Sequence, residues 1–155
     1  MNPDKTESHD WLCMYAGTLR IQGLRDEEIF YFLLAEFNGT PYLWGGSSPD
    51  GSDCSGAVCA CLNAMFLKSI RVTADCLFRR YFTRKAEGYD GIQAVFFLNQ
   101  DGKAVHVAAY AGDGLFMNVS RLEKSGGKAR NYDELGEMYP DFLMVRRKLE
   151  ASKWA

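Results

Sequence analysis

The residue best placed to do chemistry is Cys54, one of five cysteines in the chain. Ser52 or Asp53 can cap a helix that begins at this point, and residues 56–67 continue it as an almost uninterrupted apolar stretch. A thiol in the first turn of a helix lies beside unpaired backbone N–H groups and the positive end of the helix dipole, which lower its pKa. The sequence therefore predicts a nucleophilic thiolate at position 54.

The other four cysteines lack this setting. Cys59 and Cys61 fall inside the same apolar stretch, Cys76 falls inside a later helical segment, and Cys13 lies near the N-terminus. Free cysteines usually pack as small hydrophobic side chains. The odd number of cysteines and their spacing also disfavour a disulfide framework or a zinc site. We interpret all five as free thiols and expect no metal.

A thiol nucleophile needs a base, and the chain contains two histidines. His9 lies in the polar stretch 1–10, which we expect to be a mobile tail. His106 lies in the strand-like segment 103–111, where its side chain shares one face with those of residues 108 and 110. A lone histidine in an apolar strand is usually a hydrogen-bonded core residue, so a role as base depends on what lies next to it.

Asn118 is the predicted neighbour of His106. A three-residue turn would pair Tyr110 with Gly114. In that register Asn118 lies directly opposite His106 on one face of the hairpin, whereas a two-residue turn places Val119 there. Asparagine is depleted from strands, which favours a polar partner for this one. An amide at such a position orients the imidazole in Cys-His-Asn sites.

The helices that must position these residues follow from the apolar spacing. Residues 26–37 carry apolar side chains at helical intervals behind three acidic residues, and residues 54–66 form a helix so apolar that it must be buried. A shorter helix is expected over 11–22, and Thr73 can cap another over 73–82. The loop before Cys54 contains a turn at residues 48–51.

From residue 94 onward the pattern changes to strands, with a turn at 99–102 and another at 112–114. The expected strands are residues 94–98, 103–111, 115–120 and 141–149. One or two helical turns are expected over 132–138. Helices first and an antiparallel sheet second define an α+β domain.

The composition indicates one globular domain over residues 1–155, with 47% hydrophobic and 25% charged residues. A formal net charge of -2 argues against general nucleic-acid binding. The apolar stretch 56–67 is too short for a membrane span, which needs about 20 residues. Residues 68–85 carry six basic residues and one acidic residue. This basic stretch could be a solvent-exposed face, or part of it could bind an acidic ligand.

Two motifs together resemble a known family. Residues 41–56 read PYLWGGSSPDGSDCSG, and residues 106–118 read HVAAYAGDGLFMN. They resemble the NlpC-type cell-wall cysteine peptidases, a papain-like family in which Y-x-W-G-G, D-C-S-G and H-V-x-x-Y-x-G-x-G occur in this order. The resemblance covers residues 26–149 and implies a papain-like fold. It also implies that Cys54 is the nucleophile, His106 the base, and Asn118 the third member, at a position where the family has His, Asn or Gln.

The resemblance assigns substrate contacts as well. Tyr42 matches a tyrosine whose hydroxyl lies beside the nucleophile, and Asp53 and Ser55 match positions that line the site for the amino end of the substrate. Each has a simpler interpretation, because Tyr42 could be a core aromatic residue and the other two could be helix caps. For Asp53 both interpretations can hold.

The implied function is a cysteine hydrolase that cleaves an amide bond in peptidoglycan stem peptides, between D-γ-glutamate and a diamino acid, without a metal or cofactor. Alternatives are a related thiol amidase or acyltransferase, and a catalytically silent binding or phage-tail module. The polar, acidic start is not an export signal. We therefore expect a cytoplasmic enzyme acting on muropeptides, or release by a phage, lysis or contact-dependent secretion route.

Two departures from the family pattern concern the subsites. Residues 91–94 read GIQA where the family usually has P-G-D-L, and Ser52 stands where an apolar residue usually precedes D-C-S-G. Neither departure removes a catalytic group. Both are expected to change the shape of the substrate-binding region.

Overall fold

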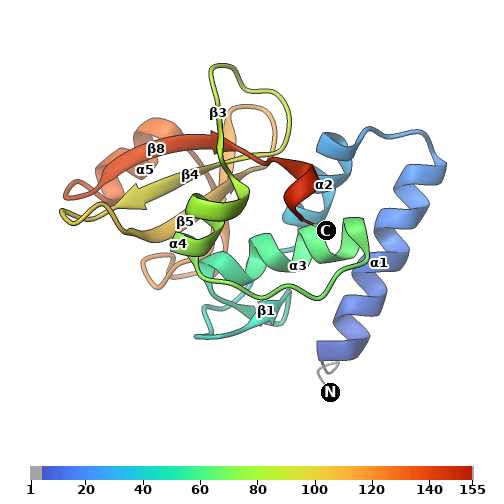
Figure 1. The fold of residues 1–155 in the computed structure, drawn as a ribbon. Coiled ribbons are helices and arrows are strands. Elements are labelled where there is room, and N and C mark those ends of the chain that lie inside the picture. The colour runs from blue at the N-terminus through green and yellow to red at the C-terminus, as the bar shows by residue number, and fades with distance from the viewer. Residues whose placement is uncertain (1–4, 155) are drawn as a thin grey trace.

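The computed structural model describes residues 5–154 and places a layer of helices against a six-stranded antiparallel sheet (Figure 1). The sheet consists of β3 (Arg84–Lys85), β4 (Gln93–Leu98), β5 (Ala104–Tyr110), β6 (Leu115–Asn118), β7 (Lys128–Asn131) and β8 (Leu143–Lys148). Its strand order is β3-β8-β4-β5-β6-β7. The C-terminal strand β8 therefore lies between β3 and β4. This arrangement confirms the predicted α+β class.

The helices flank both faces of this sheet. They are α1 (Lys5–Ile21), α2 (Asp26–Ala35), α3 (Cys54–Phe66), α4 (Ala74–Cys76), the π-helical turn η1 (Leu77–Tyr81), α5 (Tyr132–Met138) and the 3-10 turn η2 (Ala151–Lys153). The larger core lies between α1, α2, α3 and one face of the sheet. A smaller cluster on the opposite face includes Leu135 of α5 and Phe97 of β4. Because both faces are covered, the central strands are apolar on both sides.

The N-terminal helix begins earlier than expected. α1 starts at Lys5, so residues 5–10 of the expected tail are helical, and residues 1–4 lie outside the described part of the chain. Leu12, Ala16 and Leu19 form its buried stripe because they recur at helical spacing. Trp11 lies off this stripe and is 48% exposed.

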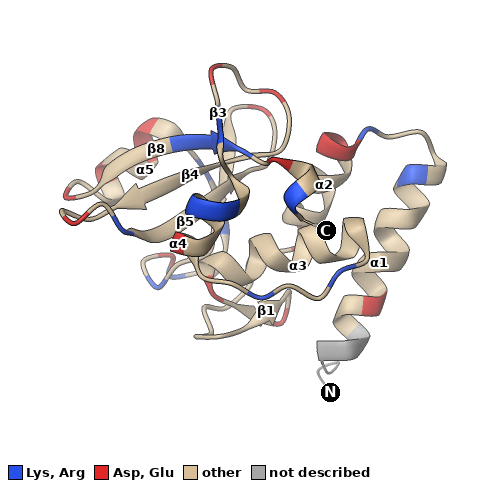
Figure 2. Ribbon diagram, in the orientation of Figure 1, with Lys and Arg blue, Asp and Glu red and all other residues tan. Residues whose placement is uncertain are grey.

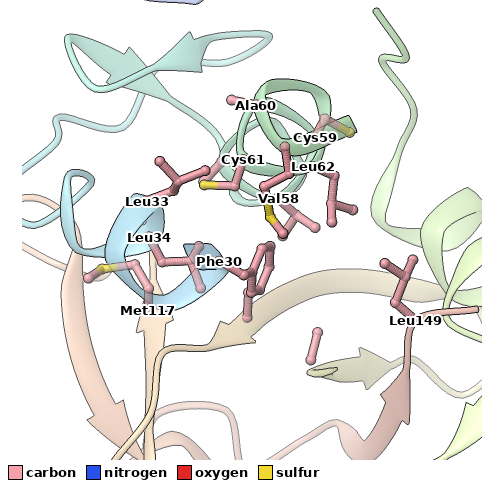
Figure 3. Close-up of a cluster of buried hydrophobic side chains, with 14 of the residues drawn as sticks. Phe30, Leu33, Leu34, Val58, Cys59, Ala60, Cys61, Leu62, Met117 and Leu149 are labelled. Atoms are coloured by element: carbon pink, nitrogen blue, oxygen red, sulfur yellow. The ribbon is translucent and has the colours of Figure 1, made fainter. Parts of the chain in front are cut away.

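The helix that begins at Cys54 has the predicted bounds. Asp53 caps α3, and ten of its residues are buried: Ser55, Gly56, Ala57, Val58, Cys59, Ala60, Cys61, Leu62, Ala64 and Met65. In Figure 3, Phe30, Leu33 and Leu34 of α2 lie beside this helix, with Met117 and Leu149 on the strand side. Packing on several sides explains why the helix has no polar face.

The segment after α3 differs from the expected continuous helix over 73–82. Thr73 caps it as predicted, with its side chain accepting a hydrogen bond from the backbone N–H of Cys76. After α4 the chain widens into η1, and the N–H of Phe82 bonds to the carbonyl of Leu77. The sequence signals the start of this segment but not its change of helix type.

Candidate active site

Cys54 is the first residue of α3, and Asp53 fixes this helix start. One carboxylate oxygen, Oδ1, accepts a hydrogen bond from the backbone N–H of Gly56 at 2.7 Å. The other, Oδ2, accepts one from Gly45 N–H at 2.9 Å, which ties the preceding loop to the helix. The same side chain therefore caps the helix and holds the loop that leads into Cys54.

The loop before Cys54 folds into a short hairpin, in which β1 (Ser47–Ser48) pairs with β2 (Gly51–Ser52) around the expected turn. Its backbone lies directly on the start of α3. A Cβ atom added at Gly56 would overlap the carbonyl oxygen of Gly46, and one added at Gly46 would overlap that of Gly51. Glycine at these two positions permits the close contact.

His106 meets its predicted partner from β5. Its Nε2 lies 2.7 Å from Oδ1 of Asn118, which is fully buried at the end of β6. The ring also packs against Phe97 and Tyr139, with centroid distances of 5.1 Å and 4.9 Å. These contacts fix both the position and the plane of the imidazole.

The predicted register of this hairpin is wrong, although the predicted contact is present. Tyr110 pairs with Phe116 rather than with Gly114, because the backbone N–H of Ala111 still bonds to the carbonyl of Leu115 and the turn is confined to residues 112–114. Extended along the strands, this register places Asn118 opposite Ala108. The shift of two residues keeps Asn118 on the face of His106, since side chains alternate with a period of two. The two residues therefore meet as diagonal neighbours.

Cys54 and His106 both line one pocket with a volume of about 830 Å³. Tyr42, Asp53 and Ser55 line the same pocket, so the structure brings together all the predicted substrate-binding residues. Asn118 lies behind His106, outside the pocket. The sequence analysis did not single out four further lining residues that can contact a ligand: Trp44, Arg71, Lys103 and Arg121. The catalytic and binding roles of these residues stay predictions.

Burial raises the pKa of Cys54, whereas its position at the start of a helix was expected to lower it. Desolvation raises the pKa of the thiol to about 11, although hydrogen bonds from the backbone N–H groups of Val107 and Ser55 oppose this rise. Burial likewise lowers the pKa of His106 to about 4, against the opposing effects of Asn118 and Glu123. The resting pair at neutral pH is therefore a thiol and a neutral imidazole, because burial disfavours both charged forms.

The lowered His106 pKa predicts how stability depends on pH. An unfolded histidine has a pKa of about 6.5, so between pH 6.5 and 4 the unfolded chain binds the proton more strongly. The contribution of His106 to stability is therefore lost as the pH falls through this window. We expect His106→Gln to lose less stability than the parent between pH 7 and pH 4.5, measured by urea unfolding. Equal losses in the two proteins would contradict a buried neutral imidazole.

Asp53 has a cationic partner within the chain. Nη2 of Arg71 lies 2.7 Å from Oδ1 of Asp53, and Nη1 of the same guanidinium donates to the Ser55 hydroxyl at 3.1 Å. The sequence analysis expected the amino end of a substrate near this carboxylate. Arg71 already balances its charge, so recognition of an amino end cannot rest on an unpaired Asp53.

Tyr42 and Arg121 form another wall of the pocket. The guanidinium of Arg121 lies over the Tyr42 ring, 4.9 Å from its centroid. Burial raises the pKa of Tyr42, so its hydroxyl keeps its proton at neutral pH. Tyr42 is partly exposed to the pocket rather than enclosed in the core. Its hydroxyl can donate a hydrogen bond there.

The basic stretch 68–85 does not act as one surface. Arg71 lines the pocket, and Arg79 pairs with Asp75 at 2.9 Å. Figure 2 shows further basic residues on the helical turn after α4, on β3 and on β8. Only part of the stretch therefore faces the candidate site.

The described part of the chain shows neither a metal-binding cluster nor a membrane-spanning helix. Among the side chains of residues 8–154, no group of three His, Cys, Asp or Glu is arranged to hold a metal ion. None of the helices described here combines the length and the apolar character needed to cross a membrane. The groups that the structure does gather are the thiol, imidazole, hydroxyl and charged side chains of the pocket.

Comparisons with known proteins agree with this geometry. Residues 39–145 match the model of the NlpC/P60 family. The chain is 31% identical over 128 residues to the probable endopeptidase YafL of Escherichia coli K12, covering 79% of this chain and 50% of that protein. It is 33% identical over 96 residues to the gamma-D-glutamyl-L-lysine dipeptidyl-peptidase of Bacillus subtilis 168, covering 59% of this chain and 31% of that protein. The chain spans half or less of the curated relatives it matches.

A solved structure shows the same arrangement of elements. NlpC1 from Trichomonas vaginalis superposes with a TM-score of 0.63 at 25% sequence identity, covering 82% of this chain and 45% of that one. The superposition thus covers most of this chain. It confirms the predicted papain-like form of the α+β fold.

Proposed function

Because the chain belongs to the NlpC/P60 family, we propose that it is a cysteine hydrolase that cleaves an amide bond in peptidoglycan stem peptides. The observation that carries this proposal is the geometry of one pocket. Cys54 at the start of α3 and His106 on β5 both line it, and Asn118 holds the imidazole from behind at 2.7 Å. This is the set of groups that nucleophilic amide cleavage by a thiol requires.

The chemistry follows from which atoms are free. Nε2 of His106 is bonded to Asn118, so Nδ1 is the nitrogen left to accept the proton of the Cys54 thiol. The sulfur attacks the amide carbonyl carbon, and backbone N–H groups at the start of α3 stabilise the oxyanion. His106 then gives its proton to the leaving amine. In the second half of the reaction it activates the water that hydrolyses the thioester.

The raised Cys54 pKa fits a coupled proton transfer. A thiol with a pKa of about 11 is protonated at neutral pH, so it needs the imidazole at the moment of attack. His106 is neutral at that pH and can act as the base. The proposal thus requires both groups, and neither one alone supplies a reactive nucleophile.

For the substrate, we propose the bond between D-γ-glutamate and a diamino acid. One relative is named a gamma-D-glutamyl-L-lysine dipeptidyl-peptidase, and a volume of about 830 Å³ is large enough for a short peptide. Lys103 and Arg121 line the pocket, and neither forms an ion pair with another side chain of residues 8–154. Their charges are available to the carboxylates of such a peptide.

Digestion of purified muropeptides tests this function. We expect the parent protein to release products cut after D-γ-glutamate, identified by mass spectrometry, whereas Cys54→Ala releases none. Products joined to an added amine rather than to water would favour the acyltransferase alternative. The absence of any cleavage by folded parent protein would contradict the proposal and favour a binding module.

The same assay addresses the amino end of the substrate. A free tripeptide and its N-acetylated form are compared by kcat/KM, in the parent and in Asp53→Asn. A preference for the free amino end that Asp53→Asn removes would support the predicted role of Asp53. Equal rates on both substrates in the parent would instead indicate that Asp53 serves only to cap α3 and to bind Arg71.

A further inference from the structure

A buried group of polar and charged side chains lies behind Asn118, and the mechanism above does not use it. We propose that Glu123, held by Arg130, is a positioning residue. It fixes the Asn118 amide with its oxygen toward His106, which keeps the ring proton on Nε2 and leaves Nδ1 free to accept the proton of Cys54. This inference rests on the proposed function.

Asn118 uses every atom of its amide. Oδ1 faces Nε2 of His106 at 2.7 Å, and Nδ2 donates to Oε2 of Glu123 at 2.9 Å and to the hydroxyl of Tyr139 at 3.2 Å. The Tyr139 hydroxyl donates its own hydrogen to Ser120 at 2.7 Å, so it faces Asn118 as an acceptor. Both hydrogens of the amide nitrogen therefore point away from His106.

Glu123 selects this orientation, because only in it do the Asn118 amide and the groups around it all form hydrogen bonds. An ionised carboxylate accepts hydrogen bonds and donates none, so the amide nitrogen, and not the oxygen, must face it. Turning the amide over would place its oxygen against a carboxylate oxygen of Glu123 in a buried site, and it would direct two N–H donors at Nε2 of His106, which can accept only one of them. The cost of such unpaired buried groups is what selects the observed orientation.

Arg130 keeps Glu123 ionised and in place. The guanidinium of Arg130 contacts both carboxylate oxygens, with Nε–Oε2 at 3.0 Å and Nη2–Oε1 at 2.7 Å. Burial alone would raise the pKa of Glu123, but hydrogen bonds from Arg130 and Asn118 outweigh it, and the pKa lies below its usual value. Glu123 is only 6% exposed, so without these partners its charge would be costly.

The orientation of Asn118 determines the state of the imidazole. Since Oδ1 is an acceptor, the nitrogen facing it, Nε2, must carry the hydrogen in a neutral ring. Nδ1 then presents a lone pair, which is what a base for Cys54 needs. If Asn118 could turn over, Nε2 would accept instead, and the proton would occupy Nδ1.

The chain supplies a matched control in Glu134. Its Oε2 binds Nη1 of the same Arg130 at 3.1 Å, but it makes no contact with Asn118. It also caps the start of α5 through Asn131, and glutamine can serve in such a capping box. Glu134→Gln therefore removes the same charge from the same arginine without altering the partner of Asn118.

The ring proton can be located directly by NMR with 15N-labelled histidine at pH 7.5. The full chain carries Cys54→Ala, so that the thiol does not influence the ring, and His106→Ala identifies the signals. We expect the parent and Glu134→Gln to carry the proton on Nε2. We expect Glu123→Gln, whose amide can donate as well as accept, to shift both ring nitrogens toward a mixture of the two forms.

Activity is measured separately with Cys54 present. Glu123→Gln is expected to lower kcat by about 10-fold, by analogy with the loss of a partner that orients a metal-bound imidazole, with little change in KM. Glu134→Gln should stay near the parent value. An unchanged ring state in Glu123→Gln, or an equal shift in Glu134→Gln, would overturn the proposal.

If Glu123→Gln does not fold, the parent spectrum still tests the ring state on which the proposal depends, because a proton on Nδ1 would overturn the proposal. The NMR result also needs no substrate. A proton on Nε2 that depends on Glu123, in a protein that cleaves no stem peptide, would count against the proposed function and leave the positioning role intact. If the parent cleaves stem peptides but Glu123→Gln changes neither the ring state nor kcat, the positioning role is contradicted and the proposed function stands.

Discussion

Replacing Cys54 or His106 by alanine is expected to lower kcat/KM for stem peptides by about three orders of magnitude or more. Each change removes a group for which the pocket offers no substitute. Without Cys54 there is no sulfur to attack. Without His106 the thiol keeps its proton, because its pKa is about 11.

Asn118→Ala is expected to cause a smaller loss, since it removes the orientation of the ring and not the proton transfer. Cys76→Ala is the control, because Cys76 is a partly buried cysteine that does not line the pocket. It should keep near-parent activity. A folded His106→Ala variant with near-normal turnover would show that the assigned mechanism is wrong.

Alkylation gives a second readout that needs no substrate. Iodoacetamide followed by peptide mapping should label Cys54 in the parent and label it more slowly in His106→Ala. The fully buried Cys59 and Cys61 should remain unlabelled in both proteins. Labelling of Cys54 that does not depend on His106 would indicate that the helix start alone activates the thiol, as its sequence setting first suggested.

The second large effect is expected from Gly56→Ala, which should destabilise the fold by on the order of 3 kcal/mol. The added methyl group would overlap the carbonyl oxygen of Gly46, a backbone atom that cannot rotate away. It would also crowd Oδ1 of Asp53. Relief requires a shift of the loop or of the helix start, so activity should fall together with stability.

Gly17→Ala is the matched control for this prediction. Gly17 lies inside α1, and a Cβ atom there would meet nothing within 4 Å. Alanine should stabilise that helix by about 0.5–1 kcal/mol, since it loses less conformational freedom on folding. Urea unfolding of the two variants and the parent is the measurement. A Gly56→Ala protein as stable as the parent would show that the loop is not packed as tightly as the structure indicates.

The sequence by itself determined the local features that bear on function. The start of α3 at Cys54 was predictable, because Asp53 is a strong capping residue and the apolar run behind it has no polar face. The strand around His106 was predictable from its alternation of residues. The face shared by His106 and Asn118 was also predictable, because a two-residue change of register preserves it.

Only the tertiary structure decided what surrounds these groups. The pKa of Cys54 rises because burial outweighs the helix start, and burial depends on the whole fold. Arg71 reaches Asp53 from 18 residues along the chain, and Arg130 and Tyr139 reach the Glu123–Asn118 pair from β7 and the end of α5. Hydrogen bonds and charge pairs of this kind depend on distances across several elements, and local periodicity carries no information about such distances.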